Sequence, residues 1–247
     1  MDIGKYATIL AVFLVAVLTV QPVLSATTMT SDNLEKDIAT SYFNQAQRLL
    51  AACVPGGTCD YEMAISLYDK ALASNTTMLK KTDGILYLYQ GKAYAQIEQE
   101  KYSDAVATAD AGLTLYPDDA MLWNNKGYAL HRLGKTQDAL ASYDKSVSFD
   151  RNYTIAHINR GDVLSQMGRY TEAVAAYTLA NETDPFNIAA YDGLKAAKTG
   201  EAESTRTMTI LSVIILIAIT GIAVWYLKFR KPAEPAPEEK KAKSKKK

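Results

Sequence analysis

The chain has 247 residues, enough for one domain with appended segments, and its formal net charge is zero because 27 basic residues balance 27 acidic ones. The balance is uneven along the chain, since residues 27–207 hold 17 Lys and Arg against 23 Asp and Glu, whereas residues 228–247 hold 9 against 3. Two cysteines, and two histidines that lie 26 residues apart, argue against a zinc-stabilised domain and against a bound metal of any kind.

The N-terminal segment 1–26 has the layout of a secretory signal peptide. A basic residue precedes the apolar run Ile9–Val20, and a Gln-Pro pair and small residues follow it. An uncleaved signal anchor is the alternative. Either segment would direct the rest of the chain out of the cytoplasm.

The next two segments are expected to be a linker, 27–38, and a helical hairpin, 39–83. Ser31 or Asp32 can cap a helix that continues to about Ala52. The second helix carries small and aromatic residues at a spacing that returns further along the chain: Ala64, Tyr68 and Ala71.

Cys53 and Cys59 flank the loop between the two helices of this hairpin. In an exported domain we expect them to form a disulfide, which the chain-entropy estimate values at about 2 kcal/mol. A metal or redox pair is the alternative, but two thiols with no histidine near them in the sequence make a poor zinc site.

Residues 84–119 are expected to form a second helical hairpin. Its residues at helical spacing are Tyr87, Gly91 and Tyr94, then Tyr102, Ala105 and Ala109, and Pro117 closes it. The turn segment IEQEKY is two residues longer than the LGKT and MGRY segments downstream, so we expect an insertion in this turn.

Residues 120–187 contain one 34-residue pattern twice, as 120–153 and 154–187. Eight aligned pairs are identical: Asn125/Asn159, Gly127/Gly161, Leu130/Leu164, Gly134/Gly168, Ala139/Ala173, Ala141/Ala175, Tyr143/Tyr177 and Asp150/Asp184. In each copy, apolar spacing of three to four residues stops at a glycine and then resumes, which predicts helix, tight turn and helix. The small residues at Gly127 and Ala139 allow a close helix crossing, and Tyr143 is expected to fill the groove between units.

These residues resemble the tetratricopeptide repeat, whose pattern has an aromatic residue, then Leu-Gly, then Ala, an aromatic residue and Ala, and a closing Pro. The chain departs from that pattern at Lys126, Ser146, Arg151 and His157. The resemblance implies an all-α superhelix of about four helix-turn-helix repeats, the first degenerate, over 39–83, 84–119, 120–153 and 154–187. It implies a repeat core formed by Gly91, Ala105, Trp123, Gly127, Ala139, Tyr143, Gly161, Ala173 and Tyr177.

In the family that the chain resembles, the first helices line a concave groove that binds peptides or partner helices. By repeat position, the groove would be lined by Leu88, Lys92, Gln96, Asn124, Tyr128, His131, Arg132, Ile158, Asp162, Ser165 and Gln166. Some members clamp a C-terminal carboxylate with a Lys and two Asn. Asn125 and Asn159 match only the common Asn and no Lys precedes Asn125, so a clamp is not expected. The alternative is that these side chains merely solvate the groove.

Four segments complete the chain. Residues 188–199 are expected to form a solvating cap helix, and 200–207 a polar spacer. Residues 208–227 carry no charge and match the ~20 residues that a membrane-spanning helix needs. Because basic residues follow this span at once and only Arg206 stands just before it, the positive-inside rule places the repeats outside and the C-terminus in the cytoplasm. The Lys-rich tail 228–247 is expected to be disordered and to contact anionic lipid or simply to stop transfer, and we expect no nucleic-acid binding.

The sequence contains no Gly-rich phosphate loop and no nucleophile elbow, so we expect neither an enzyme nor a cofactor. Three Asn-x-Thr sequons, at Asn75, Asn152 and Asn181, predict glycosylation in a host that makes N-glycans, although inter-repeat turns favour Asn in any case.

The leading hypothesis is a scaffold in the cell membrane, with a single span, that presents the repeats outward to a protein or peptide. The alternatives are an accessory subunit of a membrane enzyme or secretion complex that uses its transmembrane helix, and a structural surface glycoprotein.

Overall fold

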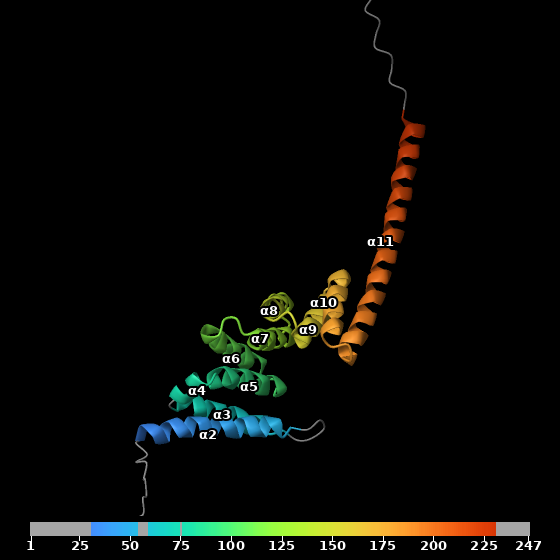
Figure 1. Ribbon diagram of the computed structural model, residues 1–247. Helices are drawn as coiled ribbons and strands as arrows, with labels where there is room; N and C mark the ends of the chain where they lie inside the picture. Colours follow the sequence, from blue (N-terminus) through green and yellow to red (C-terminus); the bar gives the residue numbers. More distant parts are fainter. Residues whose placement is uncertain (1–30, 54–58, 75, 231–247) are drawn as a thin grey trace, which may run out of the picture.

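The computed structural model describes residues 31–53, 59–74 and 76–230. These residues form helices joined by short turns, and none of them is in a β-strand, so the prediction of an all-α fold is confirmed (Figure 1). The predicted signal segment 1–26, the loop between the two cysteines, Asn75 and the tail from residue 231 lie outside the described residues.

Consecutive helices pack as hairpins. The pairs are α2 (Ser31–Ala51) with α3 (Tyr61–Ala73), α5 (Gly84–Glu98) with α6 (Tyr102–Leu115), α7 (Ala120–Arg132) with α8 (Thr136–Phe149), and α9 (Thr154–Gln166) with α10 (Tyr170–Thr183). A short helix that we did not expect, α4 (Thr77–Lys81), lies between the first two pairs. The pairs stack in a curved array, and α11 (Ile188–Phe229) extends away from its last member (Figure 1).

The hairpins are held together by aromatic side chains that fit against glycines. A Cβ atom added at Gly127 on α7 would lie 2.7 Å from Cε1 of Tyr143 on α8. One added at Gly161 on α9 would lie 2.8 Å from Cε1 of Tyr177 on α10. Both tyrosines are buried in one hydrophobic cluster that extends from α7 to α11. Packing of each tyrosine ring against the backbone of the first helix therefore requires glycine at these two positions.

The turn between α5 and α6 contains no insertion, contrary to the expectation from its sequence. In the three later hairpins one backbone hydrogen bond closes each turn at a strict 34-residue period: Lys101 N to Gln96 O, Lys135 N to Leu130 O, and Arg169 N to Leu164 O. Glu100 has a φ of 58°, in the left-handed region where Gly134 and Gly168 stand in the later turns. Glu100 thus adopts the left-handed backbone conformation that usually requires glycine. Because the sequence has no glycine at this position, the turn could not be recognised as equivalent to the two later turns.

This register moves α5 by two residues relative to the expected alignment. Ala93, which is fully buried, stands where Gly127 and Gly161 stand in the later repeats. Gly91 instead faces α3, because a Cβ atom added there would meet the ring of Tyr68. Gly91 therefore belongs to the contact between the first two hairpins rather than to the contact within its own.

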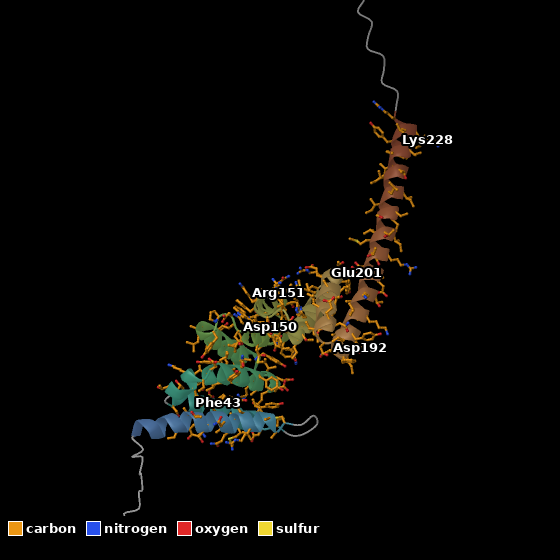
Figure 2. All side chains as sticks on the ribbon, viewed as in Figure 1. Phe43, Asp150, Arg151, Asp192, Glu201 and Lys228 are labelled. Atoms are coloured by element: carbon orange, nitrogen blue, oxygen red, sulfur yellow. A yellow bond between two sulfur atoms is a disulfide. The ribbon has the colours of Figure 1, made fainter. Side chains whose placement is uncertain are left out.

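The first helix begins at Ser31, where the sequence indicated a helix cap, so the expected linker does not extend to residue 38. At the other end, the expected cap helix, spacer and span form the single helix α11. Gly193 and Gly200 let α11 pack against Tyr177 and Tyr170 of α10, whereas every residue from 202 to 229 is exposed. Figure 2 shows Asp192 and Glu201 beside the repeats and Lys228 at the far end of the helix.

By length and composition, α11 can cross a membrane, and it is the one such helix among the described residues. At 1.5 Å per residue, the uncharged residues from Met208 to Leu227 span ~30 Å, the thickness of a hydrocarbon core. The part of α11 that packs on α9 and α10 precedes this stretch.

Candidate partner-binding groove

A pocket of about 370 Å³ opens on the face formed by the first helices of three successive hairpins, α5, α7 and α9. Its ten lining residues are Tyr94, Ile97, Glu98, Met121, Asn124, Asn125, Tyr128, Tyr153, Ile155 and Asn159. Six of the ten are aromatic or aliphatic, and only Glu98 is ionised at neutral pH. Such a site, apolar with a few polar groups, is suited to bind side chains of a partner. We call this set of residues the groove.

The groove includes two of the residues that the sequence placed there, Asn124 and Tyr128. On α5, the expected residues Leu88, Lys92 and Gln96 do not line it. In the observed register, Tyr94 and Glu98 occupy the positions that Tyr128 and Arg132 occupy in the next repeat. Leu88 and Gln96 are buried instead. A period of 34 applied without the assumed insertion would have found Tyr94, Ile97 and Glu98.

The expected residues at the C-terminal ends of α7 and α9 contact one another beside the groove. His131 Nε2 and Gln166 Oε1 lie 2.7 Å apart. Arg132 donates to the hydroxyl of Tyr128 at 3.2 Å, and its guanidinium lies 4.7 Å from the ring centroid of Tyr102. These contacts tie the polar rim of the groove to α6 and to the next repeat.

Of the other expected groove residues on α9, Asp162 accepts a hydrogen bond from the hydroxyl of Tyr177 on α10. Ile158 packs against the cluster of buried residues that includes Tyr177, so it contributes to the core rather than to the groove. The Ser165 hydroxyl is buried without a partner among the described residues. None of the three lines the pocket.

The repeated asparagines join each first helix to the preceding one. Asn125 Nδ2 donates to the backbone oxygen of Gln90 at 3.4 Å, and Asn159 Nδ2 donates to Oδ1 of Asn124 at 2.8 Å. Both bonds connect residues 35 positions apart, so the two asparagines are equivalent. Gln90 in turn donates to the carboxylate of Asp119, which accepts from Leu122 N and so caps α7.

A second ladder of contacts lies along the seams between hairpins. In each, a basic residue on a first helix pairs with an aspartate on the second helix of the preceding hairpin: Lys92 with Asp69, Lys126 with Asp110 at 2.7 Å, and Arg160 with Asp144 at 2.6 Å. The departure from the repeat pattern at Lys126 is thus part of a recurring ion pair. Lys92, expected in the groove, belongs to this ladder.

Trp123 and His157 occupy equivalent positions and form equivalent bonds. Trp123 Nε1 donates to Pro117 O at 2.8 Å, and His157 Nε2 lies 2.9 Å from Arg151 O. In both cases the ring holds the carbonyl that lies six residues earlier, in the turn between hairpins. His157 is buried, so histidine substitutes for tryptophan as a turn-fixing residue and is not available as a surface ligand.

The remaining expected core residues, Ala105, Ala139 and Ala173, occupy equivalent positions on the second helices α6, α8 and α10 and are fully buried.

Cys53 and Cys59 are joined by a disulfide, with their Cα atoms 5.2 Å apart. Among the sequon asparagines within the described residues, Asn152 is exposed in the α8–α9 turn and Asn181 is partly exposed near the end of α10. No group of His, Cys, Asp and Glu in the described part of the chain is arranged to hold a metal ion.

Burial and nearby carboxylates raise the pKa of two tyrosines of the groove, Tyr94 and Tyr153. Burial, reinforced by the negative charge of Glu98, raises the pKa of Tyr94 to about 12. Burial, with Asp119 and Asp150 nearby, likewise raises the pKa of Tyr153 to about 12. Both phenols are protonated at physiological pH, as a phenol of ordinary pKa would also be, and can donate hydrogen bonds.

Comparisons with known proteins agree with this geometry. Residues 91–154 and 155–187 each match a family model described as tetratricopeptide repeat, so this part of the chain consists of such repeats. No curated protein sequence gave a significant match. Among solved structures, the MamA protein aligns with a TM-score of 0.54 at 18% identity, covering 81% of this chain and 99% of that one, which shows a shared fold.

Two further similar structures cover a smaller part of the chain. The first TPR of Spaghetti (RPAP3), solved with the HSP90 peptide SRMEEVD, is 26% identical, with a TM-score of 0.46, and covers 47% of this chain and 93% of that one. The first TPR domain of the human RPAP3 protein is 24% identical, with a TM-score of 0.47, and covers 49% and 96% respectively.

Proposed function

We propose that this protein is a membrane-tethered adaptor that presents its repeats outside the cytoplasm and binds a peptide or partner helix in the groove. One observation carries the proposal: the first helices of three successive repeats expose apolar side chains at corresponding positions. Tyr87, Met121 and Ile155 recur at the 34-residue period and are 52%, 42% and 52% exposed. Large apolar side chains that line up on one face and stay exposed are typical of an interaction site.

The spacing of this apolar row suits an elongated partner. Packed helices lie roughly 8–10 Å apart, so successive members of the row are separated by about that distance. A peptide in the polyproline II conformation advances about 3.1 Å per residue with three residues per turn, so every third side chain points to the same side and would meet one member of the row. The groove also offers hydrogen bonds, since Asn124 Nδ2 and Asn159 Oδ1 make none with a described residue.

Membrane tethering rests on α11, whose apolar half touches no other described element. Lys228 and Arg230 follow this half, whereas Arg206 alone stands just before it. This asymmetry favours a cytoplasmic C-terminus and an extracytoplasmic repeat domain. Tetratricopeptide repeats are typically interaction modules, so we assign no catalytic role to the chain.

The test is crosslinking in the native membrane followed by mass spectrometry of the crosslinked peptides. Replacing Met121, Tyr128 and Ile155 together by Ala should abolish partner crosslinks. Replacing Leu115 and Leu179, which are as exposed but lie on second helices away from the groove, should leave them unchanged. Melting temperatures of both variants serve as the folding control. A groove variant that folds and keeps every partner would refute the proposal.

A second candidate function is that of an accessory subunit that contacts its partners through α11. The exposure of every residue from 208 to 229 favours it, because such a surface has room for another helix as well as for lipid. The same experiment separates the two functions. Crosslinks confined to 208–227 would indicate the accessory role, and crosslinks at α5, α7 and α9 the adaptor role.

A further inference from the structure

The groove contains a single ionised group. Glu98 lies near the end of α5, is exposed, and makes no ion pair with a described residue. Its carboxylate receives only a 3.4 Å contact from the hydroxyl of Tyr61 on α3. No Lys or Arg lines the pocket. A bound partner therefore meets a carboxylate that has no counter-ion among the residues lining the groove.

Positive charge on the first helices is already neutralised. Lys92, Lys126 and Arg160 pair with aspartates in the seams between hairpins. Arg132, the cation nearest to the groove on α7, lies 3.8 Å from Glu100 and stacks over the ring of Tyr102. The groove therefore lacks the free cations with which a repeat domain would hold a carboxylate or an acidic segment.

Aromatic rings surround the acidic group. Tyr94 lies one helical turn before Glu98 on α5, and its ring makes an edge contact with Tyr61 at a centroid distance of 6.3 Å. Tyr128 stands at the equivalent position of α7 and also lines the pocket. A carboxylate in a pocket that also contains tyrosine rings favours a cation, through charge and through cation–π attraction.

We propose that the partner of this groove is a peptide segment that carries Lys or Arg close to apolar side chains, bound internally and not by a terminal carboxylate. Glu98 with Tyr94 receives the basic side chain, and Met121 with Ile155 receives the apolar ones. Asn124 and Asn159 bind the peptide backbone. This inference rests on the proposed function, because it names the class of partner for the same groove.

The test is a positional-scanning library of ten-residue peptides, presented to the full-length protein in lipid nanodiscs. One half of the library has amidated C-termini and the other half has free carboxylates. We expect enrichment of Lys and Arg at one position and of aliphatic or aromatic residues about three positions away, with no difference between the two halves. In Glu98→Gln, the preference for Lys over norleucine should fall about two- to fivefold, the range for a partly exposed ion pair. The control, Glu182→Gln on α10, should keep the full preference because this exposed residue lies outside the groove.

The outcomes separate the two proposals. Enrichment of acidic residues, a requirement for the free carboxylate, or an unchanged Lys preference in Glu98→Gln would overturn the inference while leaving a peptide-binding groove. Peptides that bind with apolar preference alone would do the same. An absence of any enrichment, or enrichment that persists unchanged when Met121 and Ile155 are replaced by Ala, would overturn the proposed function itself. Glu98→Lys gives a further check, because it should convert the preference from basic to acidic peptides.

Discussion

Tyr143 and Tyr177 occupy the same position in consecutive repeats but differ in one atom's environment. The hydroxyl of Tyr177 donates to Asp162, whereas the hydroxyl of Tyr143 is buried without a partner among the described residues. The difference follows from the facing first-helix position, which is Asp162 in one repeat and Tyr128 in the other. A buried hydroxyl without a partner lowers stability, and one that donates to a carboxylate raises it.

We therefore expect Tyr143→Phe and Tyr177→Phe to act in opposite directions. Tyr143→Phe should leave the free energy of unfolding unchanged or raise it, while Tyr177→Phe should lower it by about 1.5–3 kcal/mol, the loss expected for a hydrogen bond to a charged group. Urea unfolding of each variant in detergent, followed by the far-UV circular dichroism of its helices, measures both free energies of unfolding. Tyr143→Ala is the reference for packing and should cost about 3–5 kcal/mol. Equal destabilisation by the two Phe variants would contradict this assignment of hydrogen bonds.

At the scale of the element, the α5–α6 turn contains avoidable strain. Glu100 adopts a left-handed conformation at a φ of 58°, where glycine has no steric cost. Glu100→Gly should raise the free energy of unfolding by up to about 1 kcal/mol, because the contact that it gives up with Arg132 is a long surface pair. The reciprocal change, Gly134→Ala at a φ of 76°, should lower it by about 1–2 kcal/mol. Thermal melts that move in the same direction would contradict the equivalence of the two turns.

The same turn explains where the sequence was sufficient and where it was not. The hairpins of 120–187 were predictable because glycine, alanine and tyrosine recur there at fixed positions. Each of these positions lies in a close contact between the two helices of a hairpin that a larger residue would disrupt. In 84–119 the turn glycine is replaced by Glu100, and Gly91 suggested an alignment two residues away. Three of the ten groove residues, Tyr94, Ile97 and Glu98, were missed for this reason, since the residues on α5 were taken from the wrong register. The pocket itself depends on the curvature of the stack, which no local pattern encodes.

The first hairpin differs from the others by its long loop and by the bond between Cys53 and Cys59. Thiol labelling of denatured, unreduced protein should find neither cysteine free. Reduction, or the double variant Cys53→Ser/Cys59→Ser, should lower the free energy of unfolding by about 2 kcal/mol, because the open loop regains entropy in the unfolded state. Protein expressed with and without export to an oxidising compartment provides the control. Stoichiometric labelling of exported protein would show that the pair is not a structural disulfide.

At the scale of the whole molecule, α11 is one continuous helix that packs against the repeats at its N-terminal end and is exposed over its apolar C-terminal half. The sequence suggested a cap, a spacer and a span, because Gly200 and the polar residues after it resemble an interruption. Gly200 instead provides room for Tyr170 of α10, and the polar stretch continues the helix, with Thr205 and Thr207 donating to carbonyls four residues earlier. In the proposed membrane-tethered protein, a helix that is packed against the repeats at one end and apolar at the other would connect the repeat stack to the membrane without a flexible joint.

The orientation of that helix is the remaining prediction. Because Lys228 and Arg230 follow the span and only Arg206 stands just before it, the repeats should lie outside and the tail inside. The stretch from 202 to 207 is fully exposed and contains Arg206, so trypsin added to intact cells has an accessible site there even if the folded repeats resist cleavage. We expect trypsin to release the repeat domain and to leave an epitope at the C-terminus intact, whereas in permeabilised cells the Lys-rich tail should be digested as well. An epitope that is lost from intact cells while the repeat domain is retained would show that the chain has the opposite orientation.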